Sequence, residues 1–443
     1  MLRKPSLPDA ETLRKRIPAR VLDVARAVEE AGGECYLVGG WVRDAMLGVP
    51  SKDLDVEVHR LSAEALWSLL ERFGRPSAVG RSFGIVLMRI GGEEIDFALP
   101  RTERRVGRSH RDFDVDVDPW MGFARASARR DFTVNAMGLR LPSMELCDPH
   151  GGARDLAEGV LRHVGPAFGE DPLRALRGAQ FAARFGMAIA PETVEVCAEQ
   201  ELGDLSVERI DGEFRKMLLR ADRPSVGLEA LKAMRQLRAF PELDLPGERW
   251  RAALEFCDRA AARRDALPEP ERTALMFCAL CSELAPEEAR SLLARITRDL
   301  AAAETALARL EILPELREFA RAPEAAGAAE PSGRFGRPWV RRLALKAPIP
   351  TALALLSALP GAGPVPGAEK RLESLAAAAG VLQGPPVPLL QGRDLISLGI
   401  APGPAMGELL KRAFELQLDE KLENHEKALE WAKFNVSELG NIH

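Results

Sequence analysis

The chain has 443 residues, more than the roughly 250 to 300 that one hydrophobic core can organise, so we expect at least two packed units. Its hydrophobic content of 46% and charged content of 29% exclude an intrinsically disordered protein. The formal net charge is −5, so any binding of nucleic acid must depend on local clusters of Lys and Arg rather than on overall charge.

No segment predicts export or a membrane span. The N-terminal residues lack the apolar run of a signal peptide, and no stretch approaches about 18 uninterrupted apolar residues. We therefore expect a cytoplasmic protein. Cys278 and Cys281 form a C-x-x-C, but the second pair that a zinc site needs is missing, so we expect both thiols to be buried in the core.

The first predicted elements lead from a helix into a glycine turn. Apolar residues at helical spacing predict a helix over residues 8–31, ended by Gly32 and Gly33. The stretch "CYLVGG", residues 35–40, then predicts a short buried strand that runs into a Gly-Gly turn. Residues 41–48 are compatible with one or two helical turns.

Further strands complete a small sheet. The stretch "LDVEV", residues 54–58, alternates apolar and acidic residues, which predicts a strand with one face toward a core. A helix is predicted near residues 62–73. Two strands, "GIVLMRI" (84–90) and "EIDFAL" (94–99), are separated by two glycines, which predicts a hairpin. The N-terminal part is therefore predicted to hold a mixed sheet.

The remainder of the chain is predicted to be helical. Nearly every segment from about residue 153 to 320 has helical periodicity, and Pro, Gly and Ala between about 322 and 388 predict loops between helices. We predict an α+β fold, in which a head with a mixed sheet precedes an all-helical neck, body and tail. The predicted domains are the head at 1–145, the neck at 146–225, the body at 226–330 and the tail at 331–443.

Acidic residues on two predicted strands suggest a metal site. Asp53 and Asp55 lie two residues apart on one strand, so both carboxylates project from the same face. They repel unless they are protonated or bridged by a cation, and Mg²⁺ takes oxygen ligands of this kind. Asp96, on a strand that could lie alongside, is a third candidate, and three carboxylates can clamp two metal ions for phosphoryl transfer. A D-x-D on its own is more often a solvated strand edge.

The glycine turn is suited to binding a phosphate. In "VGGWVRD", Gly39 and Gly40 lack the Cβ that would keep backbone N–H groups away from a phosphate, and Arg43 adds a charged donor. Neither the P-loop pattern nor the Rossmann pattern G-x-G-x-x-G follows the strand. A Gly-Gly turn alone does not identify a class of protein.

Five motifs in order identify a family. The order "GGWVRD", "KDLDVEV", "EIDFALPRTER", "ARRDFTVNAMG" and "EDPLRALR" resembles the class II tRNA nucleotidyltransferase and bacterial poly(A) polymerase family of the polymerase beta superfamily. The resemblance covers residues 35–220, and "LISLGIAPGPAMGELL" near the C-terminus more loosely. It implies a polymerase-beta-like nucleotidyltransferase head, a neck with a nucleotide-selecting helix, and a tail that binds RNA.

The resemblance also implies roles for individual residues. The expected metal ligands and catalytic residues, for two Mg²⁺ ions, are Asp53, Asp55 and Asp96. The expected contacts to the nucleotide are Gly39, Gly40 and Arg43 at the triphosphate, Arg130, Asp131 and Asn135 farther along it, and Asp171, Arg174 and Arg177 on a predicted helix, where the spacing i, i+3 and i+6 puts them on one face.

Two of these residues explain how a nucleotide could be chosen without a template. In the family, Asp171 and Arg174 would present an acceptor and donors to the edge of cytosine or adenine, imitating a pairing base. A carboxylate accepts from the exocyclic amino group that C and A have and that U and G lack on that edge. Taken alone, Asp-x-x-Arg on a helix is usually an intrahelical ion pair. One departure from the family is Gln180, where many members have a further arginine.

Three activities share these motifs: addition of CCA, of CC only, or of A. Relatives that add CC typically lack a flexible loop before the "RRDF" motif, whereas this chain keeps a long segment from Pro100 to Ala128. That segment carries a basic run that we expect to assist domain motion or RNA approach, consisting of Arg101, Arg104, Arg105, Arg108 and Arg111. CC-only addition is therefore disfavoured. Full CCA addition to the 3′ end of tRNA from CTP and ATP, and A addition beside a separate CC-adding partner enzyme, both stay open.

Other functions are less consistent with the sequence. Poly(A) polymerases usually carry a strongly basic tail, and this tail is mixed in charge. A His-Asp phosphohydrolase domain is not supported, because no histidine falls between residues 164 and 424. An RNA-binding protein without activity would not need closely spaced acidic residues. A small-molecule nucleotidyltransferase would not need the "RRDFTVNA" and "EDPLR" motifs or the long helical part.

Overall fold

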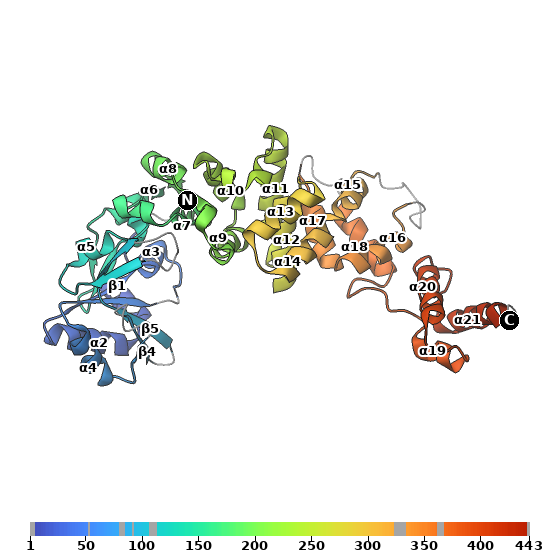
Figure 1. Cartoon of the computed structure of the whole chain (residues 1–443), viewed down its shortest axis with the longest axis horizontal. Helices are drawn as coiled ribbons and strands as arrows, with labels where there is room; N and C mark the ends of the chain where they lie inside the picture. Colours follow the sequence, from blue (N-terminus) through green and yellow to red (C-terminus); the bar gives the residue numbers. More distant parts are fainter. Residues whose placement is uncertain are drawn as a thin grey trace. The chain divides into compact units, whose positions relative to one another are not determined.

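The computed structural model describes residues 5–51, 54–78, 85–90, 93–105, 113–322, 334–360 and 367–440 (Figure 1). It forms two compact units, Met1–Asp244 and Leu245–His443. The first unit combines a mixed sheet with helices and the second is helical, so the predicted α+β fold class is confirmed. The finer division into head, neck, body and tail, with boundaries after residues 145, 225 and 330, stays a prediction.

Within the described residues the main sheet has seven strands in the order β3-β4-β5-β2-β1-β8-β9. Five of the six neighbouring pairs are antiparallel, and β2 with β5 is the parallel one, so the sheet is mixed as predicted. The strands are β1 (Glu34–Val38), β2 (Asp55–His59), β3 (Ser77–Ala78), β4 (Ile85–Ile90), β5 (Glu93–Ala98), β8 (Gly138–Leu141) and β9 (Glu145–Cys147). The glycines predicted to join β4 and β5 lie outside the described residues.

The helix predicted over residues 8–31 is in fact two helices. Helix α1 (Ala10–Arg16) ends at Ile17, whose backbone is extended, and α2 (Ala19–Glu30) begins after Pro18. Proline lacks the N–H that would continue the helix and pushes the residue before it out of the helical region, which explains the break. Helix α2 packs against α4 (Ala63–Glu71), which lies near the predicted residues 62–73 (Figure 1).

The Arg-rich segment begins as a strand. Strand β6 (Arg101–Arg105) pairs antiparallel with β7 (Phe113–Val117) in a separate two-stranded sheet. The other two arginines of the run, Arg108 and Arg111, lie outside the described residues. A short helix, α5 (Phe123–Ser127), then leads into the "RRDF" motif.

Short elements and three packed helices complete the first unit. Helix α7 contacts α9 and α10, so the helix of the "EDPLRALR" motif is held by its neighbours. The elements are η2 (Thr133–Asn135), α6 (Gly152–Glu158), β10 (Val160–Leu161), η3 (Pro166–Glu170), α7 (Leu173–Phe185), β11 (Ala188–Ile189), α8 (Pro191–Ala198), η4 (Leu202–Asp204), α9 (Val207–Arg220), α10 (Pro224–Ala233), η5 (Gln236–Ala239) and η6 (Pro241–Leu243).

The described part of the second unit consists of helices. They are α11 (Gly247–Arg264), α12 (Glu269–Cys281), α13 (Pro286–Ile296), α14 (Leu300–Leu310), α15 (Leu313–Arg321), α16 (Arg337–Lys346), α17 (Ile349–Ala358), α18 (Ala368–Ala378), α19 (Gly392–Ser397), α20 (Pro404–Leu418) and α21 (His425–Gly440). Cys278 and Cys281 are fully buried in α12, which confirms them as core thiols. Among the helices that the structure describes, none is both long and apolar enough to cross a bilayer.

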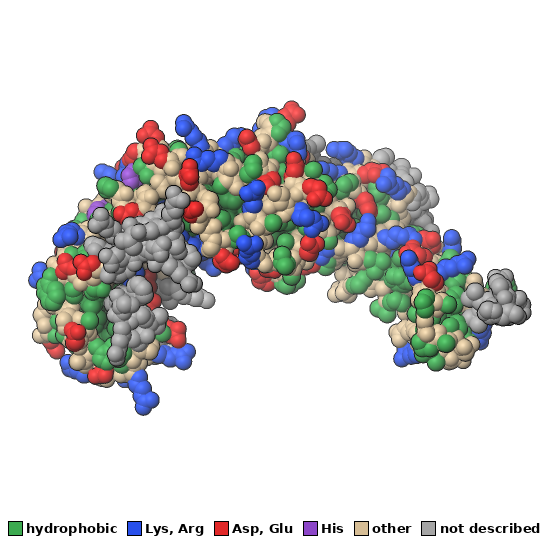
Figure 2. All heavy atoms as spheres, viewed as in Figure 1, with side chains coloured by type: hydrophobic (Ala, Val, Ile, Leu, Met, Phe, Trp, Pro, Cys, Tyr) green, Lys and Arg blue, Asp and Glu red, His purple; other side chains and the backbone are tan. Residues whose placement is uncertain are grey.

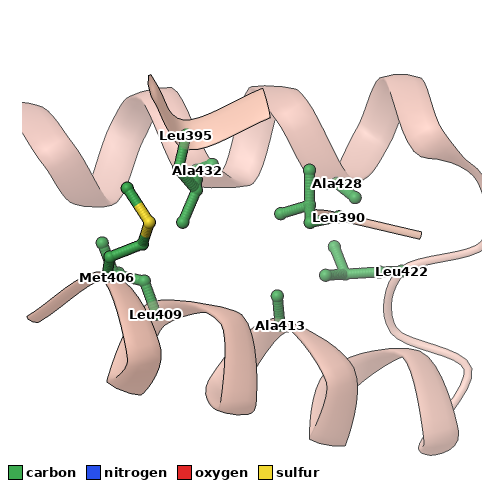
Figure 3. Close-up of a cluster of buried hydrophobic side chains, with 8 residues drawn as sticks. All are labelled: Leu390, Leu395, Met406, Leu409, Ala413, Leu422, Ala428 and Ala432. Atoms are coloured by element: carbon green, nitrogen blue, oxygen red, sulfur yellow. The ribbon is translucent and has the colours of Figure 1, made fainter. Parts of the chain in front are cut away.

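The last three helices share a small apolar core of their own. Figure 3 shows side chains of α20 and α21 pointing toward each other across this cluster, with Leu395 of α19 beside them. Ala428 and Ala432 are one turn apart on α21, so small side chains let that helix approach α20 closely. The buried members are Leu390, Leu395, Met406, Leu409, Ala413, Leu422, Ala428 and Ala432.

Candidate active site

One cavity of about 890 Å³ in the first unit gathers most of the residues singled out from the sequence. Twelve residues were predicted from the sequence to form the site, and ten of them line this cavity: Gly39, Gly40, Arg43, Asp55, Arg130, Asp131, Asn135, Asp171, Arg174 and Arg177. Asp53 lies outside the described residues, and Asp96 does not line the cavity. The cavity therefore joins motifs that are spread over more than a hundred residues of sequence.

The glycine turn lies directly beside two other motifs. Gly39 has φ +76°, a conformation that favours glycine, and it ends β1 just before α3 (Gly40–Leu47). A Cβ at this position would lie 3.2 Å from Nη1 of Arg130 and 3.6 Å from Oδ2 of Asp55. The absence of a side chain at Gly39 thus lets the turn, an arginine and a carboxylate occupy the same wall of the cavity.

Replacing Gly39 with Ala is expected to weaken nucleotide binding as well as stability. The positive φ costs roughly 1 to 2 kcal/mol for a residue with a Cβ, and the added methyl group would displace Arg130. We expect a lower melting temperature by calorimetry and a several-fold weaker Kd for CTP by titration calorimetry. Gly32→Ala is the matched control, because Gly32 also has a positive φ, +81°, but its Cβ would meet nothing within 4 Å. Equal CTP binding by both variants would contradict this prediction.

Two candidate metal ligands are paired across the parallel strands. Asp55 of β2 is the direct register partner of Asp96 of β5, and both side chains are exposed. Partners on adjacent strands lie about 4.8 Å apart and face the same side of the sheet, so the two carboxylates can share a hard divalent cation. Within the described ranges, which omit Asp53, no group of three or more His, Cys, Asp or Glu side chains is placed to hold a metal ion.

A buried carboxylate that sequence analysis did not assign to the site follows Asp55 on the same strand. Glu57 is two residues farther along β2 and only 2% exposed. Its Oε1 is 3.0 Å from Nε2 of His59, and its Oε2 is 3.8 Å from guanidinium nitrogens of both Arg129 and Arg130. Burial opposes ionisation, but the His59 hydrogen bond and the two arginine charges outweigh it and lower the pKa of Glu57. The sequence did offer a sign that Glu57 could belong to the site, because it follows Asp55 by two residues on the same predicted strand.

Arg43 is held rigidly at the start of α3. Its guanidinium is buried at 6% exposure and lies over the rings of Phe181 and Phe185, 5.2 and 4.5 Å from their centroids. Nη2 donates to Oδ1 of Asp44 at 2.7 Å, and Nη1 donates to the side-chain oxygen of Asn135. These contacts fix a positive charge next to the glycine turn, where an anion would be bound.

Asp131 and Arg177, which both line the cavity, form an ion pair. Nη2 and Nε of Arg177 donate to Oδ2 of Asp131 at 2.7 and 2.8 Å. Asn135 Nδ2 and the Phe132 backbone N–H donate to Oδ1 at 2.9 and 2.8 Å. Burial acts to raise the pKa of Asp131, but the Arg177 charge and these hydrogen bonds outweigh it and lower the pKa below its usual value. Asp131 therefore orients two other cavity residues.

The lowered pKa of Asp131 predicts an acid-labile contribution to stability. A carboxyl with a depressed folded-state pKa stabilises the fold above its unfolded pKa of about 3.9, and this stabilisation is lost as pH falls through the folded pKa. We expect Asp131→Asn to lower the free energy of unfolding by roughly 3 kcal/mol at pH 7. In urea unfolding at a series of pH values, the difference from wild type should shrink below about pH 4. A difference that stays constant down to pH 3 would contradict it.

The residues proposed to read the base are close together, but they do not all share a helix. Helix α7 begins at Leu173, so Asp171 precedes it, and the prediction that Asp171, Arg174 and Arg177 share a helical face is wrong for Asp171. Pro172 supplies no N–H and stands at the helix start, where this is tolerated. Oδ1 of Asp171 accepts the Leu173 backbone N–H at 3.1 Å and Oδ2 accepts Nη2 of Arg209 at 2.7 Å.

Arg174 reaches the cavity with two of its donors already used. Nη1 and Nη2 donate to the backbone carbonyls of Ala167 and Arg129, at 2.8 and 2.7 Å. Burial lowers the pKa of Arg174 below its ordinary value, although the nearby charges of Asp131 and Asp171 act in the opposite direction. These two carbonyl contacts fix the plane of the guanidinium against the cavity wall.

The cavity also contains basic residues that sequence analysis did not assign. Nine basic side chains line it against four acidic ones, although the whole chain is acidic. On the face in Figure 2, Lys and Arg are interspersed with Asp and Glu, and the described residues show no broad basic patch there. The additional residues are Arg129, Arg184, Arg209, Lys216 and Arg220. The last three of these residues lie on α9 at helical spacing, which could have predicted a basic face from the sequence.

The fold and this cavity define a class of protein: an α+β head in which a glycine turn, several arginines and the strand carboxylate of Asp55 line one cavity. Residues 35–162 match the family model for the Poly A polymerase head domain. The predicted resemblance to this family is therefore confirmed over residues 35–162 of the first unit.

A curated relative is similar over about half of the chain. The "Multifunctional CCA protein" of Xanthomonas campestris pv. campestris (strain B100) is 46% identical over 217 residues, which are 47% of this chain and 51% of that protein. The chain thus spans about half the length of the curated relatives it matches.

Solved structures are similar over nearly the whole chain. The Bacillus stearothermophilus CCA-adding enzyme in complex with CTP has a TM-score of 0.68 and 22% identity, covering 96% of this chain and 98% of that one. The Thermotoga maritima CCA-adding enzyme complexed with tRNA has a TM-score of 0.67 and 22% identity, covering 97% and 99%. At this level of identity the likeness shows a shared fold.

Proposed function

We propose that this protein adds CCA to the 3′ end of tRNA, using CTP and ATP without a nucleic-acid template and releasing pyrophosphate. The observation that carries the proposal is the single cavity in which the glycine turn, Asp55 and the pair Asp171 and Arg174 meet. A phosphate-binding turn and a metal carboxylate suit nucleotidyl transfer in general. A carboxylate and a guanidinium fixed in the same cavity add a means of selecting the base.

Asp55 and Asp96, with Asp53 nearby in sequence, would hold Mg²⁺, and we expect two ions. Bound there, Mg²⁺ supplies charge neutralisation at the phosphates and acidifies the attacking hydroxyl. The fit rests on two exposed carboxylates in direct register on adjacent strands. Oxygen donors of this kind suit a hard cation.

The remaining residues would bind the nucleotide along the cavity. Gly39, Gly40 and Arg43 would contact the triphosphate, and Arg130, adjacent to Gly39, would add a second charge there. Asn135 and Asp131 would position the ribose region, and Arg177 is held by Asp131. The 3′ hydroxyl of the RNA would lose its proton to one of the carboxylates and bond to the α-phosphate, while the bond to the β-phosphate breaks and pyrophosphate leaves.

Base selection would depend on Asp171 and Arg174. Each is anchored by protein contacts, Asp171 to Arg209 and Arg174 to two backbone carbonyls, so neither swings freely. An anchored carboxylate can accept from the amino group of C or A, and the guanidinium can donate from its remaining N–H groups. Rigid placement of these groups supports discrimination against U and G, because a mismatched base leaves buried polar groups unpaired.

Two related activities are the alternatives. The protein would add only the terminal A if a separate enzyme supplied CC, or it would be a poly(A) polymerase. The names of the similar proteins, "Multifunctional CCA protein" and CCA-adding enzyme, favour CCA addition. We also propose that the tail binds RNA and that the segment from Pro100 to Ala128 assists domain motion or RNA approach, as expected from the sequence.

The deciding experiment is nucleotide incorporation by the purified protein with Mg²⁺. Three tRNA transcripts, ending before CCA, after C and after CC, are each supplied with labelled CTP and ATP, separately and together. Extension of all three to CCA, followed by a stop, is the expected result. Addition of A only to the transcript ending in CC would identify an A-adding enzyme, and long A tails on unrelated RNA would identify a poly(A) polymerase. No incorporation into any of these RNAs would refute the proposal.

A further inference from the structure

Strand β2 carries three polar side chains on one face. Asp55, Glu57 and His59 are two residues apart along the strand, so their side chains project from the same side of the sheet. Asp55 is exposed and lines the cavity, whereas Glu57 and His59 are 2% and 1% exposed and do not line it. Burying ionisable side chains costs free energy unless partners compensate it, so the contacts of this buried pair show what the burial serves.

His59 fixes one oxygen of Glu57. Its Nε2 lies 3.0 Å from Oε1 of Glu57, and because an ionised carboxylate can only accept hydrogen bonds, Nε2 carries the proton and donates. The imidazole is held in turn by two other rings, with its centroid 5.2 Å from that of Tyr36 and 6.2 Å from that of Phe123. The carboxylate of Glu57 thus has a fixed orientation, and its Oε2 is left for other contacts.

The second oxygen of Glu57 attracts two arginines that line the cavity. Oε2 lies 3.8 Å from Nη2 of both Arg129 and Arg130. At this distance the charges attract each other without a hydrogen bond, so the contact does not use up the N–H groups of Arg130. Nε of Arg130 is buried and has no hydrogen bond to any residue that the structure describes. Glu57 therefore holds the guanidinium in place and leaves its donors for a ligand.

The surroundings of Arg130 explain why its position has to be held. Its Nη1 would lie 3.2 Å from a Cβ at Gly39, so the guanidinium lies directly against the glycine turn. Nine basic side chains line the cavity, and their mutual repulsion would move a flexible arginine toward solvent unless a nearby negative charge retained it. Glu57 supplies that charge from a position that does not line the cavity.

We propose that Glu57 is a positioning residue, which holds Arg130 against the glycine turn so that the guanidinium meets the triphosphate of the bound nucleotide. The inference rests on the proposed function and assigns a role to a residue that acts only through its neighbour. His59 supports the same arrangement by fixing the carboxylate of Glu57. Because all nucleoside triphosphates share their phosphates, Glu57 contributes equally to the binding of CTP and ATP.

The test removes the charge of Glu57 while preserving the shape of the side chain. For Glu57→Gln, binding of CTP, ATP and inorganic tripolyphosphate is measured by titration calorimetry with Mg²⁺ and without RNA. A weakened contact to a charged group corresponds to roughly a tenfold weaker Kd, and the same factor is expected for all three ligands. In steady-state assays the KM for CTP and for ATP should rise together while kcat stays near the wild-type value.

A double-mutant cycle with Arg130→Met separates positioning from a general effect on the fold. In the Arg130→Met background, Glu57→Gln should weaken CTP binding by less than about twofold further, because the residue through which Glu57 acts is gone. If Glu57→Gln does not fold, His59→Phe tests the same arrangement. This variant keeps a ring beside Tyr36 and Phe123 and retains the charge of Glu57, and we expect a several-fold weaker Kd for CTP.

The matched control is Glu271→Gln in the second unit. Glu271 is paired with Arg309 at 2.7 Å and does not line the cavity, so this variant should lower the melting temperature and leave CTP binding unchanged. Unchanged binding of CTP and tripolyphosphate by whichever of Glu57→Gln and His59→Phe folds would overturn the inference, as would an equal loss with and without Arg130. A fall in kcat at constant KM would also overturn it, by placing the role of Glu57 at the metal site. Failure of the wild-type protein to bind CTP would instead contradict the proposed function itself.

Discussion

Asp55→Asn is expected to abolish nucleotide addition, with a loss in rate of about 10³-fold or more. The substitution keeps the size of the side chain but removes the negative charge that would hold a divalent cation opposite Asp96. Asp55 is exposed, so the fold should be nearly unaffected, and the change in the free energy of unfolding should stay within about 0.5 kcal/mol. The measurement is single-turnover incorporation of labelled CTP into a tRNA transcript that lacks CCA.

A control for this variant is available on the neighbouring strand. Glu94 is exposed on β5, two residues before Asp96, and does not line the cavity. Glu94→Gln removes a carboxylate from the same face of the sheet, so it tests whether any nearby loss of charge has the same effect. We expect near wild-type incorporation from it. Incorporation at the normal rate by Asp55→Asn would show that Asp55 is not a catalytic ligand.

Asp171→Ala is expected to reduce the preference for C and A over U and G by about 10- to 100-fold. The carboxylate would no longer accept from an exocyclic amino group, and Arg209 would lose its partner at 2.7 Å. Incorporation of each of the four nucleotides, measured as kcat/KM on the transcript lacking CCA, reports the change directly. The rates for CTP and ATP should fall, whereas those for UTP and GTP should not.

The control for Asp171 is an aspartate in the same kind of ion pair. Asp211 pairs with Arg215 on α9 at 2.9 Å but does not line the cavity. Asp211→Ala should therefore keep the nucleotide preference of the wild-type protein. An equal fall in kcat/KM for all four nucleotides in Asp171→Ala would mean that Asp171 supports the cavity without reading the base.

The elements that were predictable from sequence are those with local causes. The strand, glycine turn and short helix around Gly39 were predicted because apolar alternation, a Gly-Gly pair and a terminal glycine each act within a few residues. The strand of Asp55 and the two strands near Asp96 followed from the same kind of pattern. The error in the first helix was also local, since Pro18 breaks it where the apolar spacing continues.

Ordered motifs, not periodicity, led to the candidate site. The periodicities give no distance between the glycine turn and the "EDPLRALR" motif, which are separated by about 130 residues of sequence. The resemblance to a family predicted that both motifs belong to one site. In the structure, ten of the twelve residues predicted for that site line one cavity. The basic residues of α9 were not predicted to belong to the site, because a charged helix face usually does no more than face the solvent.

By itself the sequence determined the local elements, the residue types available for metal and phosphate binding, and the family of the head domain. Only the tertiary structure decided that β2 and β5 run parallel with Asp55 opposite Asp96, that Glu57 is buried, and that Asp171 precedes α7 and pairs with Arg209. The physical reason is that strand register, burial and ion pairing depend on contacts between residues far apart in the chain. Local propensity and spacing carry no information about those contacts.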